Sequence, residues 1–272
     1  MEGVKIVPCD LGIYLSKNCQ KKLDKLASLK ERQKAKDKLK REKKQSLPPQ
    51  ELEADHVPKK ELKALQKERA RQSLIDGQKI AIDFSYEKLM SYKELCKLAG
   101  QIRRLYGSNL KFLKPFHICL TSVSIDSPLL AVCRQQNDGF DNYLLDIEQK
   151  SPLDLFGRGD IVYLSPDAKT VLTDIDPNSV YVIGGLVDHQ ILRETTTSSA
   201  ESSSVRTARL PIDEYMEFST GKRHTNKRVL AVNQVVDILL KYVETSDWQV
   251  ALSHGVPKRT GLVLKHVEAG LQ

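Results

Sequence analysis

Hydrophobic positions divide the chain into two regions with different patterns. Before residue 76, apolar residues are sparse and form only thin stripes along two basic helices predicted over 17–45 and 59–73. The segment 46–58 between these helices contains three prolines and is predicted to be a linker. From Asp76-Gly77 onward, short apolar runs alternate with segments of helical spacing. The pattern predicts an N-terminal extension over 1–75, followed by a globular domain.

The globular region alternates predicted strands with predicted helices. Strands are predicted over 79–84, 117–122, 160–164, 180–183 and 207–210, and residues 143–147 form a strand or part of one. Helices are predicted over 91–109, 127–136 and 229–244, around Trp248, and, for a short stretch, from Ser165-Pro166. The first of these opens with the capping-box pair Ser91 and Glu94, and Gly107 is expected to end it. Such alternation favours a parallel sheet with helices on both faces.

One predicted strand, 180–183, runs directly into Gly184-Gly185 and then reaches an acid, Asp188. Two glycines at a strand end allow a sharp turn or a close approach of the backbone to a ligand. By itself the stretch fits either a plain turn with a surface carboxylate or a binding loop. Leu164-Ser165 and Leu210-Pro211 also follow predicted strands. Because ligands of parallel sheets bind at the carboxyl ends of strands, these three places could form one crevice.

Positive charge is concentrated in the N-terminal extension. The whole chain has a net charge of +8, whereas Lys17–Lys44 alone holds thirteen Lys or Arg against four acids. The rest of the chain is therefore close to neutral. Such an arm indicates a polyanionic partner, most simply nucleic acid, although a solvated helix or a nuclear localisation signal has the same composition. The RNA contacts predicted in the arm are Lys34, Lys36, Lys38 and Lys40.

Two further groups of basic residues lie in the globular region. Arg103, Arg104, Lys111 and Lys114 surround the stretch Y-G-S-N-L-K-F. Basic and aromatic side chains together suit an RNA-binding surface, and a solvated helix end is the alternative. The second group lies near the proposed crevice: Arg206, Arg209, Lys222, Arg223, Lys227 and Arg228. Of this group, Arg206 and Arg209 are predicted to contact RNA.

Several common kinds of site are absent from the sequence. It contains no G-x-G-x-x-G, phosphate loop, H-E-x-x-H or G-x-S-x-G pattern. The five cysteines are odd in number and form no C-x-x-C pair, which favours free thiols in a reducing compartment, cytoplasmic or nuclear, and no metal site. No apolar run approaches the roughly 18 residues that span a membrane. The N-terminus lacks the pattern of a secretory signal.

Seven segments occur in the order and spacing of one known family. They are LAGQIRRLYGSN (98–109), NDGF (137–140), YLSPDA (163–168), VIGGLVD (182–188), RLPIDEY (209–215), RVLAVNQVVDIL (228–239) and DWQVAL (247–252). Over residues 76–260 the chain resembles the tRNA methyltransferase 10 family of the SPOUT superfamily, most closely its animal homolog B branch. This resemblance implies a methyltransferase domain over 76–260 and a C-terminal tail over 261–272.

The resemblance also implies an activity and an architecture. The expected reaction is methylation, by S-adenosylmethionine, of the N1 atom of the purine at position 9 of tRNA, with guanine favoured over adenine. The expected fold is an α/β sheet with a C-terminal trefoil knot, and the expected catalytic form is a monomer. The basic N-terminal extension is expected to help hold tRNA. A non-catalytic tRNA-binding protein that keeps this fold is the alternative, whereas DNA binding by the arm alone would leave the glycine loop unexplained.

By the same resemblance, Asp188 is the candidate catalytic carboxylate. Beside guanine it could accept the N1 proton that leaves as the methyl group arrives, and beside adenine it would stabilise the cationic product. Whether it is a true base or an orienting acceptor stays open. The implied cofactor contacts are Leu164, Gly185, His189, Gln190, Thr196 or Thr197, Leu210, Arg228, Val229 and Leu230.

Some of these residues have a second interpretation. Leu164, Leu210 and Leu230 fit an ordinary core as well as an apolar ligand pocket. Asp83, at another strand end, is either a second site carboxylate or a helix-capping residue. The stretch 194–204 is rich in Ser and Thr, where family members tend to carry a more charged segment.

Overall fold

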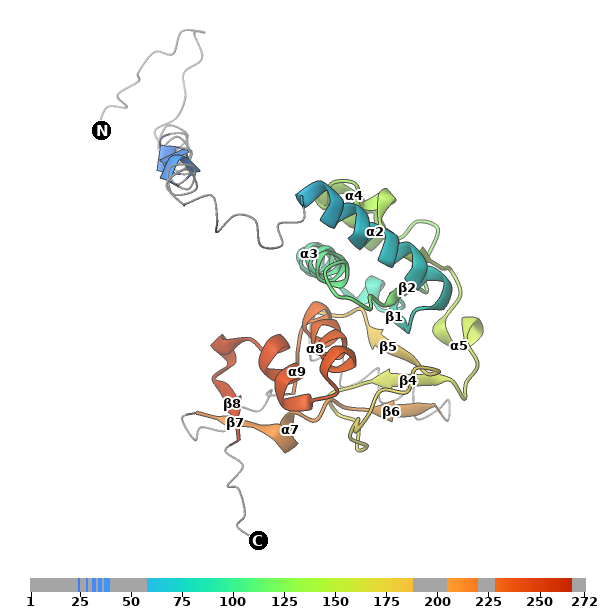
Figure 1. Ribbon diagram of the computed structural model, residues 1–272. Coiled ribbons are helices and arrows are strands. Elements are labelled where there is room, and N and C mark those ends of the chain that lie inside the picture. Colours follow the sequence, from blue (N-terminus) through green and yellow to red (C-terminus); the bar gives the residue numbers. More distant parts are fainter. Residues whose placement is uncertain are drawn as a thin grey trace, which may run out of the picture. The chain divides into compact units, whose positions relative to one another are not determined.

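The computed structural model describes residues 58–187, 205–219 and 228–265, together with isolated helical positions between 24 and 39. Contacts divide the chain into two compact units, Met1–Pro58 and Lys59–Gln272. The second unit holds the sheet and the helices that pack on it (Figure 1). The helix that precedes the first strand belongs to this unit, and the predicted start of the methyltransferase domain at residue 76 stays a prediction.

A parallel sheet of six strands forms the centre of this unit, in the order β3-β2-β1-β5-β4-β6. Figure 1 labels these strands except β3. Every pairing between these strands is parallel, which confirms the predicted sheet. The strands are β1 (Lys79–Asp83), β2 (His117–Thr121), β3 (Asp146–Ile147), β4 (Ile161–Leu164), β5 (Val180–Gly184) and β6 (Arg206–Ala208). The segment predicted over 143–147 thus contributes a strand only at its last two residues.

The helices follow the predicted alternation. They are α2 (Lys59–Asp76), α3 (Tyr92–Asn109), α4 (Pro128–Gln136), α5 (Pro152–Leu155), α7 (Ile212–Tyr215), α8 (Val232–Thr245) and α9 (Trp248–Gly255), with short 3₁₀ turns at Glu87–Leu89, Phe140–Asn142 and Lys258–Thr260. No helix among the described residues is both long and apolar enough to cross a membrane. A small antiparallel hairpin, β7 (Met216–Phe218) with β8 (Leu262–Leu264), was not predicted, and β8 lies within the predicted tail.

The predicted range of α3, 91–109, is confirmed, but the expectation that Gly107 ends the helix is wrong. The backbone amide of Ser91 donates to Glu94 Oε2 at 2.8 Å, as expected for a capping box. The helix continues past Gly107 to Asn109. The Asn109 side chain donates to the carbonyl of Phe116 and accepts from its amide, at 2.9 and 2.8 Å. These two bonds attach the last turn to the start of β2, so the helix extends beyond the glycine.

Two other predicted boundaries differ for tertiary reasons. Ser165-Pro166 opens a turn and not a helix, because the following chain is held extended: Val171 pairs with Arg209, and the Leu172 amide donates to the Arg209 carbonyl at 2.8 Å. Helix α8 begins at Val232, three residues after the predicted start at 229. The Val232 amide donates to Gln101 Oε1 of α3 at 3.0 Å. Residues 228–230 therefore stay outside the helix.

The two faces of the sheet pack differently. Ile80 and Ile82 belong to a large core cluster that also contains the apolar faces of α3, α4, α8 and α9. Ala81, which points to the opposite face, belongs to a smaller cluster with Val182 and with Phe156 beside α5. Among the described residues, α3, α4, α8 and α9 therefore pack on one face, and α5 contributes to the other.

Candidate functional site

The carboxyl ends of three neighbouring strands lie in register at one edge of the sheet. Asp83 of β1 is paired with Gly184 of β5, and Leu164 of β4 is paired with Ile183 of β5. The chain after β6 reaches the same edge, because the Ser165 amide donates to the Ala208 carbonyl at 2.9 Å. The predicted meeting of three strand ends is thus confirmed for the described residues.

A pocket opens at this edge, and five predicted cofactor residues line it. Leu164 comes from β4, Leu210 follows β6, and the other three, Arg228, Val229 and Leu230, form the stretch before α8. Gly184 and Ser165, which the sequence placed at the expected crevice, also line it, as does Arg209, which was predicted to contact RNA. Sequence reasoning missed the other lining residues, which are Pro166, Ile183, Leu186, Val232 and Val235. Most of them are neighbours of predicted residues in the chain, and Val235 lies one helical turn beyond Ala231. The walls are mainly apolar and include two arginines.

The described pocket is small, with a volume of about 60 Å³. A larger cavity of about 540 Å³ lies near Gly77, Phe116 and Pro177, at the amino ends of β1, β2 and β5. Ligands of parallel sheets bind at the carboxyl ends of strands, where loops of different origin meet. We therefore take the smaller pocket as the candidate site. Among the described residues, no cluster of His, Cys, Asp and Glu could hold a metal ion.

Gly185 does not line this pocket, and its lack of a side chain has a different cause. Its amide donates to the Asp83 carbonyl at 2.9 Å, and a Cβ atom at this position would lie 2.9 Å from the same oxygen. Real Cβ atoms rarely approach an oxygen so closely. The glycine is therefore required by the contact between β5 and β1, and its predicted role as a cofactor contact stays a prediction.

Asp83 is buried at the same edge. Its Oδ1 accepts from the Ser85 amide at 3.0 Å, and its Oδ2 lies 3.5 Å from the hydroxyl of Tyr163. Burial, followed by the charge of Asp83, raises the pKa of Tyr163 well above its usual range, so this phenol stays protonated and can donate. The bond to Ser85 closes a local turn and is not a helix cap, because the next helical turn, Glu87–Leu89, has Tyr86 at its N-cap position. A role for Asp83 as a second site carboxylate stays a prediction.

The remaining predicted site residues fall outside the described residues. They are Asp188, His189, Gln190, Thr196 and Thr197, all in the segment 188–204 that follows β5. Leu186, two positions before Asp188 in the chain, lines the pocket.

The predicted RNA-binding residues fall into three groups. Arg103, Arg104, Lys111 and Lys114 are exposed around the end of α3, and Lys34 and Lys38 are exposed helical positions, whereas Lys36 and Lys40 lie outside the described residues. Arg206 donates to the Gly159 carbonyl at 2.6 Å and to the Ser179 hydroxyl at 3.1 Å. Arg209 is ion-paired with Glu214. The last two arginines thus have partners within the protein, and their RNA role stays a prediction.

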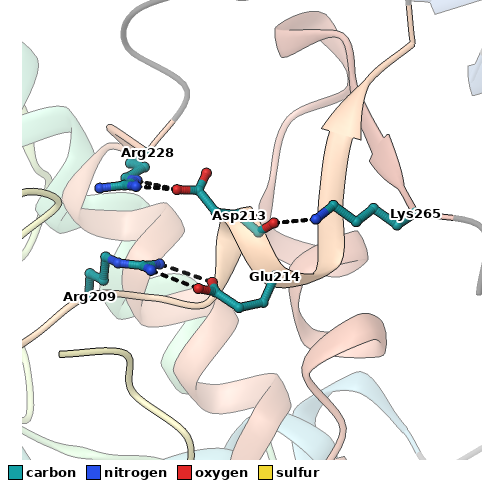
Figure 2. A network of polar contacts seen from close by, with 5 residues as sticks. All are labelled: Arg209, Asp213, Glu214, Arg228 and Lys265. Atoms are coloured by element: carbon teal, nitrogen blue, oxygen red, sulfur yellow. Dashed lines mark hydrogen bonds and ion pairs between the residues drawn. The ribbon is translucent and has the colours of Figure 1, made fainter. Parts of the chain in front are cut away.

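Helix α7 carries two acids that the sequence reasoning did not single out (Figure 2). Glu214 accepts from both terminal nitrogens of Arg209, at 2.9 and 2.7 Å. The neighbouring Asp213 accepts from Nε of Arg228 at 2.5 Å. The bonds from Arg209 hold the pKa of Glu214 below its usual value, so Glu214 is charged at neutral pH. Both arginines that line the pocket are therefore neutralised from α7.

Comparisons with known proteins agree on one family. The model of the family described as tRNA (guanine(9)-N(1))-methyltransferase TRM10/TRM10A matches residues 14–261. The tRNA methyltransferase 10 homolog B of Mus musculus is 42% identical over 266 residues, which is 97% of this chain and 84% of that protein. Its Homo sapiens counterpart is 47% identical over 208 residues, 76% of this chain and 66% of that protein. The homolog A of Mus musculus is 35% identical over 205 residues, 75% of this chain and 59% of that protein.

Solved structures show the same relationship. The crystal structure of full-length spTrm10 in complex with SAH has a TM-score of 0.58 and 29% identity, covering 66% of this chain and 94% of that one. The structure of spTrm10(74) has a TM-score of 0.60 and 28% identity, covering 68% and 97%. Together with the parallel sheet and the pocket at its carboxyl edge, these similarities show that the chain belongs to the TRM10 family of tRNA methyltransferases, nearer to the compared homolog B proteins than to homolog A.

Proposed function

We propose that this protein transfers a methyl group from S-adenosylmethionine to the N1 atom of the purine at position 9 of tRNA, with guanine as the favoured base. One observation carries the proposal: Leu164, Leu210 and the stretch 228–230, far apart in the sequence, line one pocket. Apolar walls with few polar groups suit the adenine and methionine parts of this cofactor. The spTrm10 complex with SAH supports the choice, because S-adenosylhomocysteine is what remains after the methyl group leaves.

The described walls account for only part of such a site. A cavity of about 60 Å³ is far below the ~300–1,000 Å³ of ordinary small-molecule pockets. The remaining contacts are assigned to Gly185, His189, Gln190 and Thr196 or Thr197, on the segment that leaves β5. These residues follow the pocket wall directly in the chain, because Ile183, Gly184 and Leu186 line it.

Asp188 supplies the proton chemistry of this proposal. Guanine N1 carries a proton that must leave as the carbon–nitrogen bond forms, and a carboxylate within hydrogen-bond reach can accept it. The methyl group moves from the cofactor's sulfur to N1, and the sulfur keeps the electron pair of the broken bond. Adenine N1 has a free lone pair, so on adenine the carboxylate would stabilise the positive charge of the product.

The topology fits the trefoil knot that we propose for the C-terminal part of the domain. Strand β6 lies beside β4, on the side away from β5, although β5 precedes β6 in the sequence. The chain must therefore cross from one side of β4 to the other after it leaves β5. Such a crossing also occurs in unknotted parallel sheets, and knots are rare in proteins, so the proposal of a knot rests on the family. We propose a monomer as the catalytic form.

We test the reaction directly with tRNA transcripts that differ only in having G or A at position 9. Transfer of a labelled methyl group to the G9 transcript, with the label recovered as 1-methylguanosine, is the expected result. Calorimetry with S-adenosylmethionine alone provides the binding control. Binding of the cofactor without transfer to either purine across a panel of tRNAs would instead favour a non-catalytic tRNA-binding protein.

Deletion of residues 1–45 is expected to weaken tRNA binding about tenfold at physiological salt and to flatten its salt dependence. The deleted segment carries the excess positive charge of the chain, and each lost phosphate contact removes one released counterion. Fluorescence titration of labelled tRNA from 50 to 300 mM salt measures both quantities. Cofactor affinity should hardly change. An unchanged tRNA affinity and salt slope would show that the arm does not contact phosphates.

A further inference from the structure

The two acids of α7 connect the two pocket walls that come from different parts of the chain. Arg209, which Glu214 holds at both terminal nitrogens, directly precedes Leu210 of one wall. Arg228, which Asp213 holds, directly precedes Val229 of the other. Both arginines themselves line the pocket. One four-residue helix is therefore bonded to a residue of each wall.

Helix α7 is itself braced from its other side (Figure 2). Lys265, just after β8, donates from Nζ to the Asp213 carbonyl at 2.6 Å and from its backbone amide to the Tyr215 carbonyl at 2.9 Å. The backbone of Arg209 is fixed as well, because its amide donates to the Thr170 carbonyl at 2.9 Å. The acids are thus presented from a supported element and not from a free loop.

The ion pair between Arg209 and Glu214 has the geometry of a strong charge-assisted pair, because it is bidentate. The Arg209 side chain is 12% exposed and that of Glu214 is 36% exposed, whereas the side chains of Arg228 and Asp213 are 41% and 22% exposed. The pair between Arg134 and Asp141, at 2.8 Å, has side chains that are 52% and 65% exposed. Exposed pairs of that kind contribute little, so it serves as a matched control.

Charge compensation gives the network a chemical consequence for the cofactor. S-adenosylmethionine carries a permanent positive charge on its sulfonium, whereas the sulfur of S-adenosylhomocysteine is neutral. Two uncompensated guanidinium groups at the pocket would repel the sulfonium, and such repulsion is strong where water is partly excluded. Asp213 and Glu214 remove this repulsion while they hold both walls in place.

We infer that Asp213 and Glu214 are positioning residues that make the pocket able to accept a cationic sulfonium, by holding and neutralising Arg209 and Arg228. The inference rests on the proposed cofactor site. It assigns the acids no contact with the reacting atoms. It predicts that loss of either acid weakens binding of S-adenosylmethionine more than binding of S-adenosylhomocysteine.

The test is calorimetric binding of S-adenosylmethionine and of S-adenosylhomocysteine to wild type, Glu214→Gln and Asp213→Asn. Both substitutions preserve the size of the side chain and remove its charge. We expect the Kd for S-adenosylmethionine to rise about tenfold and that for S-adenosylhomocysteine less than about threefold. The control Asp141→Asn should change neither value. Equal rises for both ligands, or no rise, would overturn the inference, because a purely structural role would not distinguish them.

A double substitution tests charge compensation directly. Arg209→Gln combined with Glu214→Gln removes both charges, so the preference between the two ligands should return to that of wild type even if both bind more weakly. A preference that stays shifted in the double variant would contradict charge compensation. If Glu214→Gln does not fold, the pair Asp213→Asn and Arg228→Gln gives the same comparison independently. Failure of wild type to bind S-adenosylmethionine would reject the proposed function, whereas normal binding with an unshifted preference rejects only this inference.

Discussion

Asp188→Asn is expected to slow methyl transfer to a G9 tRNA by about 10²- to 10⁴-fold, the range for loss of a general base. The substitution keeps the size and shape of the side chain but removes its negative charge and most of its basicity. If Asp188 removes the guanine N1 proton, the residual rate should rise with pH, because hydroxide or deprotonated substrate must then accept the proton. Single-turnover methylation of matched G9 and A9 transcripts across a pH series measures this.

The same experiment separates the two roles that Asp188 could have. If the carboxylate mainly orients the base or stabilises charge, the loss should be smaller and the pH profile should keep its shape. Binding of tRNA and of cofactor should stay nearly unchanged in either case. Asp126→Asn, at an exposed position in the loop after β2, is the matched control and should retain wild-type rates. Full activity of Asp188→Asn on both transcripts would remove this residue from the site.

Val229→Trp is expected to reduce cofactor binding by about 100-fold or more, because the indole ring would fill a pocket of only about 60 Å³. The residue precedes α8 and is only partly buried, so the domain should still fold. Calorimetry with S-adenosylhomocysteine measures the affinity, and circular dichroism checks the fold. Val263→Trp is the matched control, because Val263 is 41% exposed in β8 and does not line the pocket.

Wild-type affinity in a folded Val229→Trp protein would show that the cofactor binds elsewhere. The larger cavity at the amino ends of the strands would then become the first alternative. Gly185→Val would be a less informative test of cofactor binding. A side chain there would clash with the Asp83 carbonyl, so lost binding could follow from a displaced β5 alone.

The sequence by itself determined the elements whose residues interact locally or share one burial pattern. The capping box at Ser91 and Glu94 and the apolar run of β1 depend on neighbouring positions only, and both are confirmed. The sequence also indicated the family, because the family's motifs occur in the same order and spacing along this chain. Strand alternation with helices was sufficient to predict a parallel sheet, and the rule for ligands in such sheets placed the crevice at Leu164 and Leu210.

Only the tertiary structure decided features that depend on partners distant in the chain. Ser165-Pro166 has the residues of a helix start, but pairing between Val171 and Arg209 keeps the following chain extended. Gly185 looked like a ligand-binding glycine, and its close neighbour is the Asp83 carbonyl of another strand. The sequence marked Arg209 as a candidate RNA contact but could not show that the residue is ion-paired with Glu214. The spacing of hydrophobic residues indicates which side chains are buried. It does not indicate which polar groups contact each other, because those contacts form only when strands and loops distant in the chain come together in the fold.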